Sequence, residues 1–322
     1  MEQSPWCSGV VSAWALLIAA GCGPNAGWGP WSQDEVIEPE PQPPTDLTID
    51  QLTGGFTLVI GDGVSRLSGI LRGGKAPGEP LWILSRKAGG CSVNMERPTC
   101  QPACSGVKVC SEQLACVYGP WPMDVGTIYV NGVGGAELSM SASEGKYLLE
   151  GDALPYPPCN PGGKVELAAD GGRFGPFTLS GECITPLVFS APINAERHKP
   201  LKLSWTEANA GSGRMRIQIA LGGGTHAAIR IVCDVDDSGD IEIEAALLEQ
   251  LVQLGVTGLP SVTMTRLSAG GTDGSEPRQV FLSIQHSVAR EFEMKGVTCR
   301  EDIDCPPSQI CYQGTYCKTK TK

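Results

Sequence analysis

The sequence is poor in several residue types on which common functions depend. Among 322 residues it has only 3 histidines, 6 phenylalanines and 6 tyrosines, and 24 Lys and Arg residues stand against 35 Asp and Glu residues. The net charge of −11 excludes nucleic acid as an expected partner, because nucleic-acid binding needs a basic surface. It also disfavours electrostatic binding to anionic lipid headgroups.

Recognisable catalytic motifs are missing as well. The chain has no G-x-S-x-G, H-E-x-x-H or P-loop pattern, which would indicate a serine hydrolase, a zinc protease or a nucleotide-binding enzyme. His226 follows three glycines but has no adjacent acid or nucleophile that would complete a triad. Paired carboxylates for glycoside cleavage leave no sequence signature. We therefore predict no enzyme, with an unrecognised hydrolase as an alternative.

No apolar run has the roughly 20 residues that a transmembrane helix needs. The run at 9–21 is shorter, ends in small residues and is followed by Cys22, which is typical of a bacterial lipoprotein signal. The segment before it departs from the usual positive start, since it carries Glu2 and no Lys or Arg. An ordinary secretory signal cut near Ala20 is the alternative, and both interpretations export the protein.

Cys22 is therefore the predicted lipidation site, and the lipid would make the membrane a partner. Gly23 follows the cysteine, and no aspartate is present there to signal inner-membrane retention. We expect the protein at the outer membrane or cell surface. Residues 22–45 are rich in proline and acidic residues, and such a composition forms an extended tether rather than a core.

Segments in which apolar and polar residues alternate dominate the chain after the tether. Side chains of a strand point to opposite faces by turns, so each segment offers one face to a core. Turns rich in glycine and aspartate separate the segments. One segment, 245–254, has a stripe of leucines before Gly255 and predicts a helix. The clearest predicted strands are 164–167, 201–205, 215–219 and 280–284.

These patterns predict an all-β fold: two antiparallel β-sandwich (Ig-like) domains with one short helix and two small disulfide-rich knots. An alternative is that the two halves share a single sheet system. The expected divisions are a signal peptide at 1–21, the tether at 22–45, a first sandwich at 46–190 with a Cys-rich knot inserted at 91–116, a second sandwich at 191–297 and a C-terminal knot at 298–322.

Twelve cysteines follow Cys22, an even number that predicts disulfides in an exported chain. Eight of them form two similar sets, in which a leading cysteine precedes the spacing Cys-x5-Cys-x5-Cys. Each set is too small to own a core, so we expect two crossed bridges in each. Zinc is the competing interpretation, but no C-x2-C pair is present. The expected bridges are Cys100–Cys110, Cys104–Cys116, Cys299–Cys311 and Cys305–Cys317.

Four other cysteines lie within the predicted sandwiches: Cys91, Cys159, Cys183 and Cys233. Their pairing is not readable from the sequence, because four cysteines allow three connectivities. The pair Cys159–Cys183 would close the shortest loop. All four are predicted to be in disulfides.

The segment that begins at Asp234 is the sharpest candidate for ion binding. Asp234, Asp236, Ser238 and Asp240 are spaced like the first ligands of an EF-hand calcium loop. Position twelve of that loop, which normally provides a bidentate Glu, is Ala245 here. An acidic hairpin turn between two strands is therefore the favoured interpretation. We expect no cofactor, and a weak Ca²⁺ site is the alternative.

The C-terminal knot carries the pattern Asp304-Cys305-Pro306, with Cys299 before it and Cys311 after it. In this pattern the chain resembles a group of uncharacterised Cys-rich β-sandwich surface lipoproteins of myxobacteria. The resemblance implies a β-sandwich surface lipoprotein without an assigned activity. The other matching segments are 126–132, 170–177, 200–205, 231–240 and 245–248.

The expected function is that of an exported, lipid-anchored cell-surface protein with a structural or binding role. A calcium-dependent or carbohydrate-binding adhesion module is the alternative, with a protein or glycan of unknown identity as partner. Trp82 and Trp121 are candidate aromatic contacts for such a ligand. A buried tryptophan inside a sandwich is the competing interpretation for both.

Overall fold

The computed structural model describes most of the chain after the predicted tether. The predicted signal peptide, Cys22 and the tether, together residues 1–45, lie outside the described residues. No helix within the described part is long and apolar enough to cross a membrane. The described ranges are 47–61, 63–74, 82–106, 108–134, 138–150, 154–189, 191–208, 213–221, 229–254, 259–271, 280–313 and 316–320.

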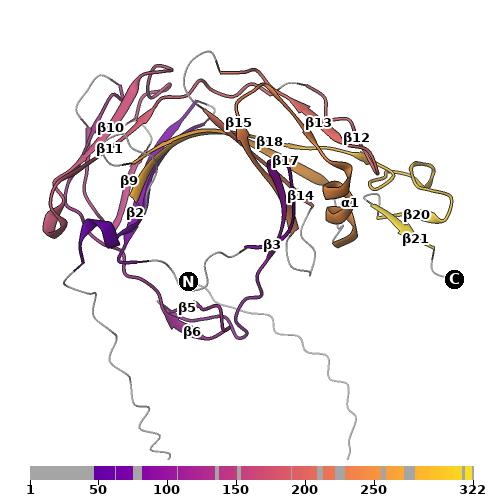
Figure 1. Cartoon of the computed structure of the whole chain (residues 1–322), viewed down its shortest axis with the longest axis horizontal. Coiled ribbons are helices and arrows are strands. Elements are labelled where there is room, and N and C mark those ends of the chain that lie inside the picture. The colour runs from indigo at the N-terminus through magenta and orange to yellow at the C-terminus, as the bar shows by residue number, and fades with distance from the viewer. Residues whose placement is uncertain are drawn as a thin grey trace, which may run out of the picture. The chain divides into compact units, whose positions relative to one another are not determined.

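Nine strands form the largest sheet of the described residues (Figure 1). In most of these strands buried apolar residues alternate with more exposed ones, as β1 shows at Phe56 to Ile60. One face of the sheet therefore meets the cores and the other does not. In spatial order the strands are β3 (Trp82–Ala88), β4 (Cys91–Glu96), β15 (Ile229–Asp236), β14 (Arg214–Leu221), β17 (Pro260–Gly270), β18 (Val280–Glu291), β1 (Thr53–Ile60), β2 (Ser65–Arg72) and β9 (Lys146–Glu150).

This sheet combines strands from both predicted halves of the chain. β1 pairs with β18 in parallel, with Phe56 opposite Leu282. At the other end, β4 pairs antiparallel with β15, with Val93 opposite Ile231. The alternative in which the two halves share a sheet therefore describes the topology. The finer expectation of two separate, antiparallel Ig-like sandwiches is not established, because the halves are hydrogen-bonded to each other and one joining pair is parallel.

A second sheet of four strands covers one part of the large sheet. Its strand β10 contains the predicted strand at 164–167. The neighbouring strand β11 contacts both β17 and β18. Gly270 permits this close approach, because a Cβ built there would lie 1.8 Å from the Ser180 carbonyl oxygen. Phe56, Leu167 and Leu282 belong to the resulting first core. In spatial order the strands are β11 (Phe177–Glu182), β10 (Lys164–Ala169), β7 (Ile128–Asn131) and β8 (Leu138–Met140).

A second core lies under the other part of the large sheet. The predicted strand at 201–205 is confirmed as β13 (Leu201–Ser204), which pairs with β16 (Asp240–Ile243). Leu203 packs in one cluster with Ile217 and Ile231 of the large sheet. Each core thus has two layers, although both share the nine-stranded sheet. Figure 1 shows that sheet curving, with β10, β11 and the helix α1 (Ala245–Leu254) on its outer side.

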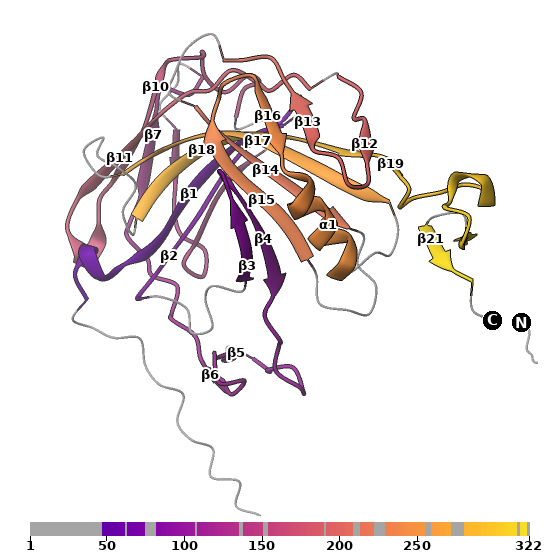
Figure 2. The same ribbon diagram turned by 45° about the vertical axis from the view of Figure 1, so that its right-hand side comes forward.

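The predicted helix is confirmed as α1 (Ala245–Leu254). Leu247, Leu248 and Leu251 are almost completely buried in the second core, and the helix contacts β15, β4 and β3 (Figure 2). Its other side carries Glu249, which forms a two-bond ion pair with Arg197. The leucine spacing of about 3.6 residues per turn therefore identified the buried side correctly.

All twelve cysteines after Cys22 are paired. The four crossed bridges of the two knots agree with the predicted pairing. Of the remaining cysteines, Cys159 pairs with Cys183 beside the first core, and Cys91 pairs with Cys233 between the neighbouring strands β4 and β15. The knots carry the hairpins β5 (Lys108–Cys110) with β6 (Cys116–Tyr118) and β20 (Gln309–Tyr312) with β21 (Tyr316–Thr319).

The two hairpins lie apart from each other in both views (Figures 1 and 2), as expected for independent knots. The described part also holds a short parallel pair that leads into the C-terminal knot, and three 3-10 turns. These elements are β12 (Ala195–Glu196) with β19 (Met294–Lys295), η1 (Ile49–Gln51), η3 (Gly172–Phe174) and η4 (Asp302–Asp304).

Candidate functional site

The face of the large sheet that points away from both cores is the first candidate site. Along β14 the buried residues Met215, Ile217 and Ile219 alternate with more exposed ones. The neighbouring strands follow the same rule, so polar side chains from several strands share one face. The residues of this face on β14, β15 and β17, leaving out the buried Leu267, are Arg214, Arg216, Gln218, Ala220, Arg230, Val232, Asp234, Asp236, Ser261, Thr263, Thr265 and Ala269.

Three arginines, Arg214, Arg216 and Arg230, form what we call the arginine patch. Arg214 donates from Nε to Asp234 Oδ1 at 2.7 Å, and Arg216 donates from Nη2 to Asp234 Oδ2 at 3.2 Å. Arg214 also reaches Asp236, at 3.3 Å. Burial acts to raise the pKa of Asp234, but the hydrogen bonds from the two arginines outweigh it and hold that pKa below its usual value. Asp234 is therefore an ionised partner of arginines.

This geometry bears on the predicted calcium ligands. Asp234 is engaged by Arg214 and Arg216, and the Ser238 hydroxyl donates to the Asp240 carbonyl oxygen at 3.0 Å. Among the described residues, the carboxylates of this segment form no group of three oxygens close enough to hold one ion. The segment therefore offers few free oxygens to a cation that prefers six to eight.

The expected acidic hairpin is wrong in one respect. β15 and β16 are not partners of each other: β15 pairs with β14 and β4, whereas β16 pairs with β13. The segment at 237–239 therefore passes from the large sheet to a small one. Asp237 also differs from a solvated turn residue, because its side chain is only 5% exposed. The alternation of apolar and polar residues does not indicate which strand pairs with β15. The hairpin was expected because strands that follow each other in sequence often pair.

Asp237 is buried because it pairs with Arg266 of β17. Arg266 donates from Nε to Asp237 Oδ2 at 2.7 Å, and Trp205 donates from Nε1 to Asp237 Oδ1 at 2.6 Å. Arg266 further donates to the carbonyl oxygens of Thr185 and Thr206. Both partners of the pair thus have further hydrogen bonds, and these bonds connect four segments of the chain. Sequence reasoning missed it, since no local pattern marks Arg266 as buried.

Arg230 is the member of the arginine patch that forms no ion pair with Asp234 or Asp236. Its guanidinium carbon lies 3.6 Å from the centroid of the Trp82 ring, a cation–π contact. Nη1 donates to Gln218 Oε1 at 3.2 Å, and Nε has no hydrogen-bond partner among the described residues. Burial, and then repulsion from Arg216, lower the pKa of Arg230, while Glu96 opposes them with a weaker attraction.

Trp82 and Trp121, the predicted aromatic contacts, have different surroundings. Trp82 is partly exposed on the first strand of the large sheet and supports Arg230. Trp121 packs against the first core instead. Only Trp82 therefore belongs to a surface that faces away from the cores.

The predicted histidine candidate, His226, lies outside the described residues. His198 is exposed, with Nδ1 at 3.2 Å from a Glu249 carboxylate oxygen. His286 is buried and accepts a hydrogen bond at Nδ1 from the Leu187 backbone N–H. Both described histidines thus have contacts that explain them structurally.

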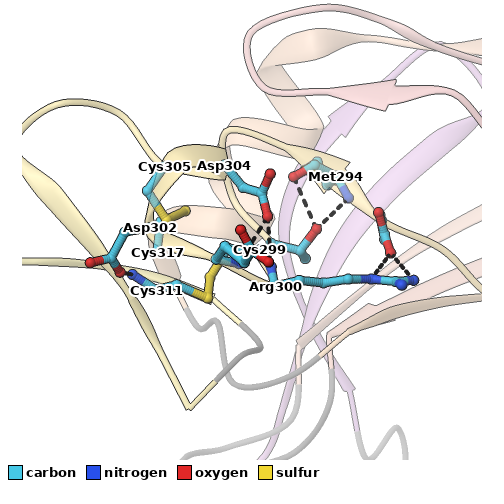
Figure 3. The surroundings of a disulfide bond; sticks show 11 residues. Met294, Cys299, Arg300, Asp302, Asp304, Cys305, Cys311 and Cys317 are labelled. Carbon is cyan, nitrogen blue, oxygen red and sulfur yellow. Dashed lines mark hydrogen bonds and ion pairs between the residues drawn. A yellow bond between two sulfur atoms is a disulfide. The ribbon is translucent and has the colours of Figure 1, made fainter.

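The C-terminal knot is joined to the body by its own first residues (Figure 3). The buried Thr298 hydroxyl accepts from the Met294 N–H at 2.7 Å and donates to the Met294 carbonyl. Asp304 accepts the backbone N–H groups of Arg300 and Glu301, which lower the pKa of its carboxyl. Three sulfur atoms of each knot lie within 4.8 Å of one another, but disulfide sulfurs are not the thiolates that zinc requires.

An open cleft of about 620 Å³ lies where this knot meets β12 and β19. Polar side chains dominate its lining, including Glu196, Glu293, Lys295 and Asp304, although Ile303 beside it is 87% exposed. Two of the acids already have partners, since Glu293 pairs with Arg300 and Glu196 with Lys199. The three acids of the lining, Glu196, Glu293 and Asp304, thus already have partners within the protein.

Neither the comparison with protein-family models nor the comparison with curated proteins finds a match for this chain.

Proposed function

We propose that the protein is an exported, lipid-anchored cell-surface protein that acts by binding rather than by catalysis. The observation that carries the proposal is the pairing of every cysteine from Cys91 to Cys317 in six disulfides. Six disulfides persist in oxidising compartments outside the cytosol and are rare inside it. Export therefore explains the cysteine content.

The lipid anchor is proposed from the sequence. Cys22 follows a short apolar run with small residues at its end, and processing of such a signal leaves a lipid on that cysteine. The tether at residues 22–45 would then hold the folded body away from the membrane. Gly23 after the cysteine supports the outer membrane as the location. The resemblance to myxobacterial surface lipoproteins, carried by the C-terminal knot, supports the same assignment.

A binding role is favoured over a catalytic one by the polar face of the large sheet. That face presents Arg216, Arg230 and Gln218 from neighbouring strands, whereas the described histidines are occupied in structural contacts. A calcium-dependent mode is less favoured, because Asp234 is already paired with arginines. The proposed partner is therefore bound by direct polar contacts.

Fatty-acid labelling of the full chain in a Gram-negative host tests export and anchoring. We expect the wild-type protein to incorporate labelled palmitate and to partition into detergent, and Cys22→Ala to abolish the label. Cys7→Ala is the matched control, because Cys7 lies in the segment that processing removes. A wild-type protein without label that is recovered soluble would refute the lipid anchor. Free thiols on the exported, unreduced protein would refute the assignment to an oxidising compartment.

A further inference from the structure

We propose that the arginine patch and the polar side chains beside it bind an acidic polysaccharide, a polymer whose sugar units carry carboxylates. The inference names a ligand class for the binding role proposed above and rests on it. The central element is Arg230, supported by Trp82 and flanked by Arg216 and Gln218.

The charge of Arg230 favours an anionic ligand. The acids closest along the same strand, Asp234 and Asp236, pair with Arg214 and Arg216. Arg230 makes its one described hydrogen bond to an uncharged amide, that of Gln218. Guanidinium groups bind carboxylates through two parallel hydrogen bonds. Glu96 also attracts Arg230, but more weakly than burial and Arg216 act against its charge. A ligand carboxylate would therefore complement this cation.

The side chains around Arg230 favour a hydroxyl-rich ligand. Asn94 is opposite Arg230 on β4 and donates to the Ser92 hydroxyl at 2.9 Å. Farther along the face, Thr265 is opposite Arg216, and it shares a hydrogen bond of 2.8 Å with Ser287 of β18. Amides and hydroxyls both donate and accept hydrogen bonds. These groups lie on β4, β15, β14, β17 and β18, so a long ligand could contact several of them at once.

A protein partner is less favoured by the same face. Protein interfaces depend on a central cluster of aromatic or apolar anchors that becomes fully buried. On β14 and β15 the only apolar side chains of this face are Ala220 and Val232, and both are partly buried already. Leu84 is exposed on β3, at the end of the sheet. This face has many polar groups and one cation, Arg230, that stacks on Trp82. It therefore fits an acidic sugar better than a protein partner.

Calorimetry with the mature protein and polygalacturonate at low ionic strength tests the proposal. We expect binding that weakens with added salt, since exposed charges are screened. Arg230→Gln should weaken it about tenfold or more, because a charge-assisted pair of hydrogen bonds is lost. Arg216→Gln should also weaken it. The control Arg300→Gln, in the C-terminal knot and paired with Glu293, should bind as the wild type does. Neutral dextran should not bind.

Three outcomes would overturn the inference. The first is no detectable binding of polygalacturonate by the wild type, and the second is equal binding by Arg230→Gln. The third is equally strong binding of poly-glutamate, which would indicate a site for acidic polypeptides. None of these results tests the lipid anchor, because binding is measured at the folded body rather than at Cys22. A protein that labels with palmitate but fails this test retains the proposed anchoring and loses only the proposed ligand.

Discussion

Arg266 and Asp237 form an ion pair that is almost completely buried, with 1% and 5% of their side chains exposed and 2.7 Å between Nε and Oδ2. Arg266 comes from β17, in the large sheet, and Asp237 from the connection to the small sheet that covers the second core. The pair thus fixes one layer to the other. Buried pairs are retained only when their remaining hydrogen bonds are satisfied, and Trp205 supplies one of them.

Asp237→Asn is expected to destabilise the protein by about 3–5 kcal/mol, because it leaves the Arg266 charge buried without a counter-charge. Asp236→Asn is the matched control: its side chain is 92% exposed, and we expect a change within about 0.5 kcal/mol. Urea unfolding of the mature, disulfide-intact protein measures both free energies. Equal stabilities of the two variants would show that the buried pair contributes little.

The double variant Cys91→Ala/Cys233→Ala is expected to lose about 2–5 kcal/mol of unfolding free energy. This bridge joins neighbouring strands of the large sheet that are 142 residues apart in sequence. Cys305→Ala/Cys317→Ala opens the C-terminal knot alone, and should leave the main urea transition unchanged. Similar losses in both variants would contradict independent folding of the knot. Peptide mapping of the unreduced protein checks all six bridges.

Residues 46–190 expressed alone are expected not to fold cooperatively. In that fragment β1 lacks its partner β18, and β4 lacks its partner β15. Unpaired strand edges expose backbone groups that otherwise form hydrogen bonds. Coexpression with 191–322 is the control, and should restore a soluble, folded complex. A fragment that unfolds in one sharp transition by itself would instead support the two independent domains predicted from the sequence.

Calcium is expected to bind weakly, with a Kd of about 10⁻⁴–10⁻³ M. Arg214 and Arg216 already occupy the Asp234 carboxylate, and position twelve of the motif is Ala245. Calorimetry on the mature protein measures the affinity, and Asp50→Ala, far from this segment in sequence, serves as a control. A micromolar affinity that Asp236→Ala abolishes would make the calcium-dependent adhesion module the better proposal.

Tyr147 is expected to make stability depend on pH above 10. Desolvation is the main cause that raises its pKa from 10.0 to about 12, and its hydroxyl donates to the Gly126 carbonyl and accepts the Val125 N–H. A raised pKa in the folded state means that the stabilisation is complete below pH 10 and is lost as the pH rises through about 12. Tyr147→Phe should lower the free energy of unfolding by about 1 kcal/mol at pH 7. The variant should then lose less of its remaining stability as the pH rises above 10. Unfolding curves at pH 8 to 11 compare the two, and parallel curves would show that Tyr147 is not responsible.

The sequence by itself determined the elements with a local physical cause. The leucine spacing at 245–254 predicts α1 because helix geometry places those residues on one side. Alternation at 164–167 and 280–284 predicts strands, because successive side chains point to opposite faces. The repeated cysteine spacing predicts crossed bridges within each knot, since the partners are few and close in sequence.

Only the tertiary structure decided which strands became neighbours. Alternation shows which face of β1 is buried but carries no information about its partner, so the parallel pairing with β18 was not predictable from either strand. The same holds for Cys91 with Cys233, whose pairing depends on β4 lying beside β15. Arg266 has no local sign of burial, because its counter-charge, Asp237, lies 29 residues away. Arg230 and Trp82 come together for the same reason: long-range register sets their contact, and no spacing in the sequence encodes it.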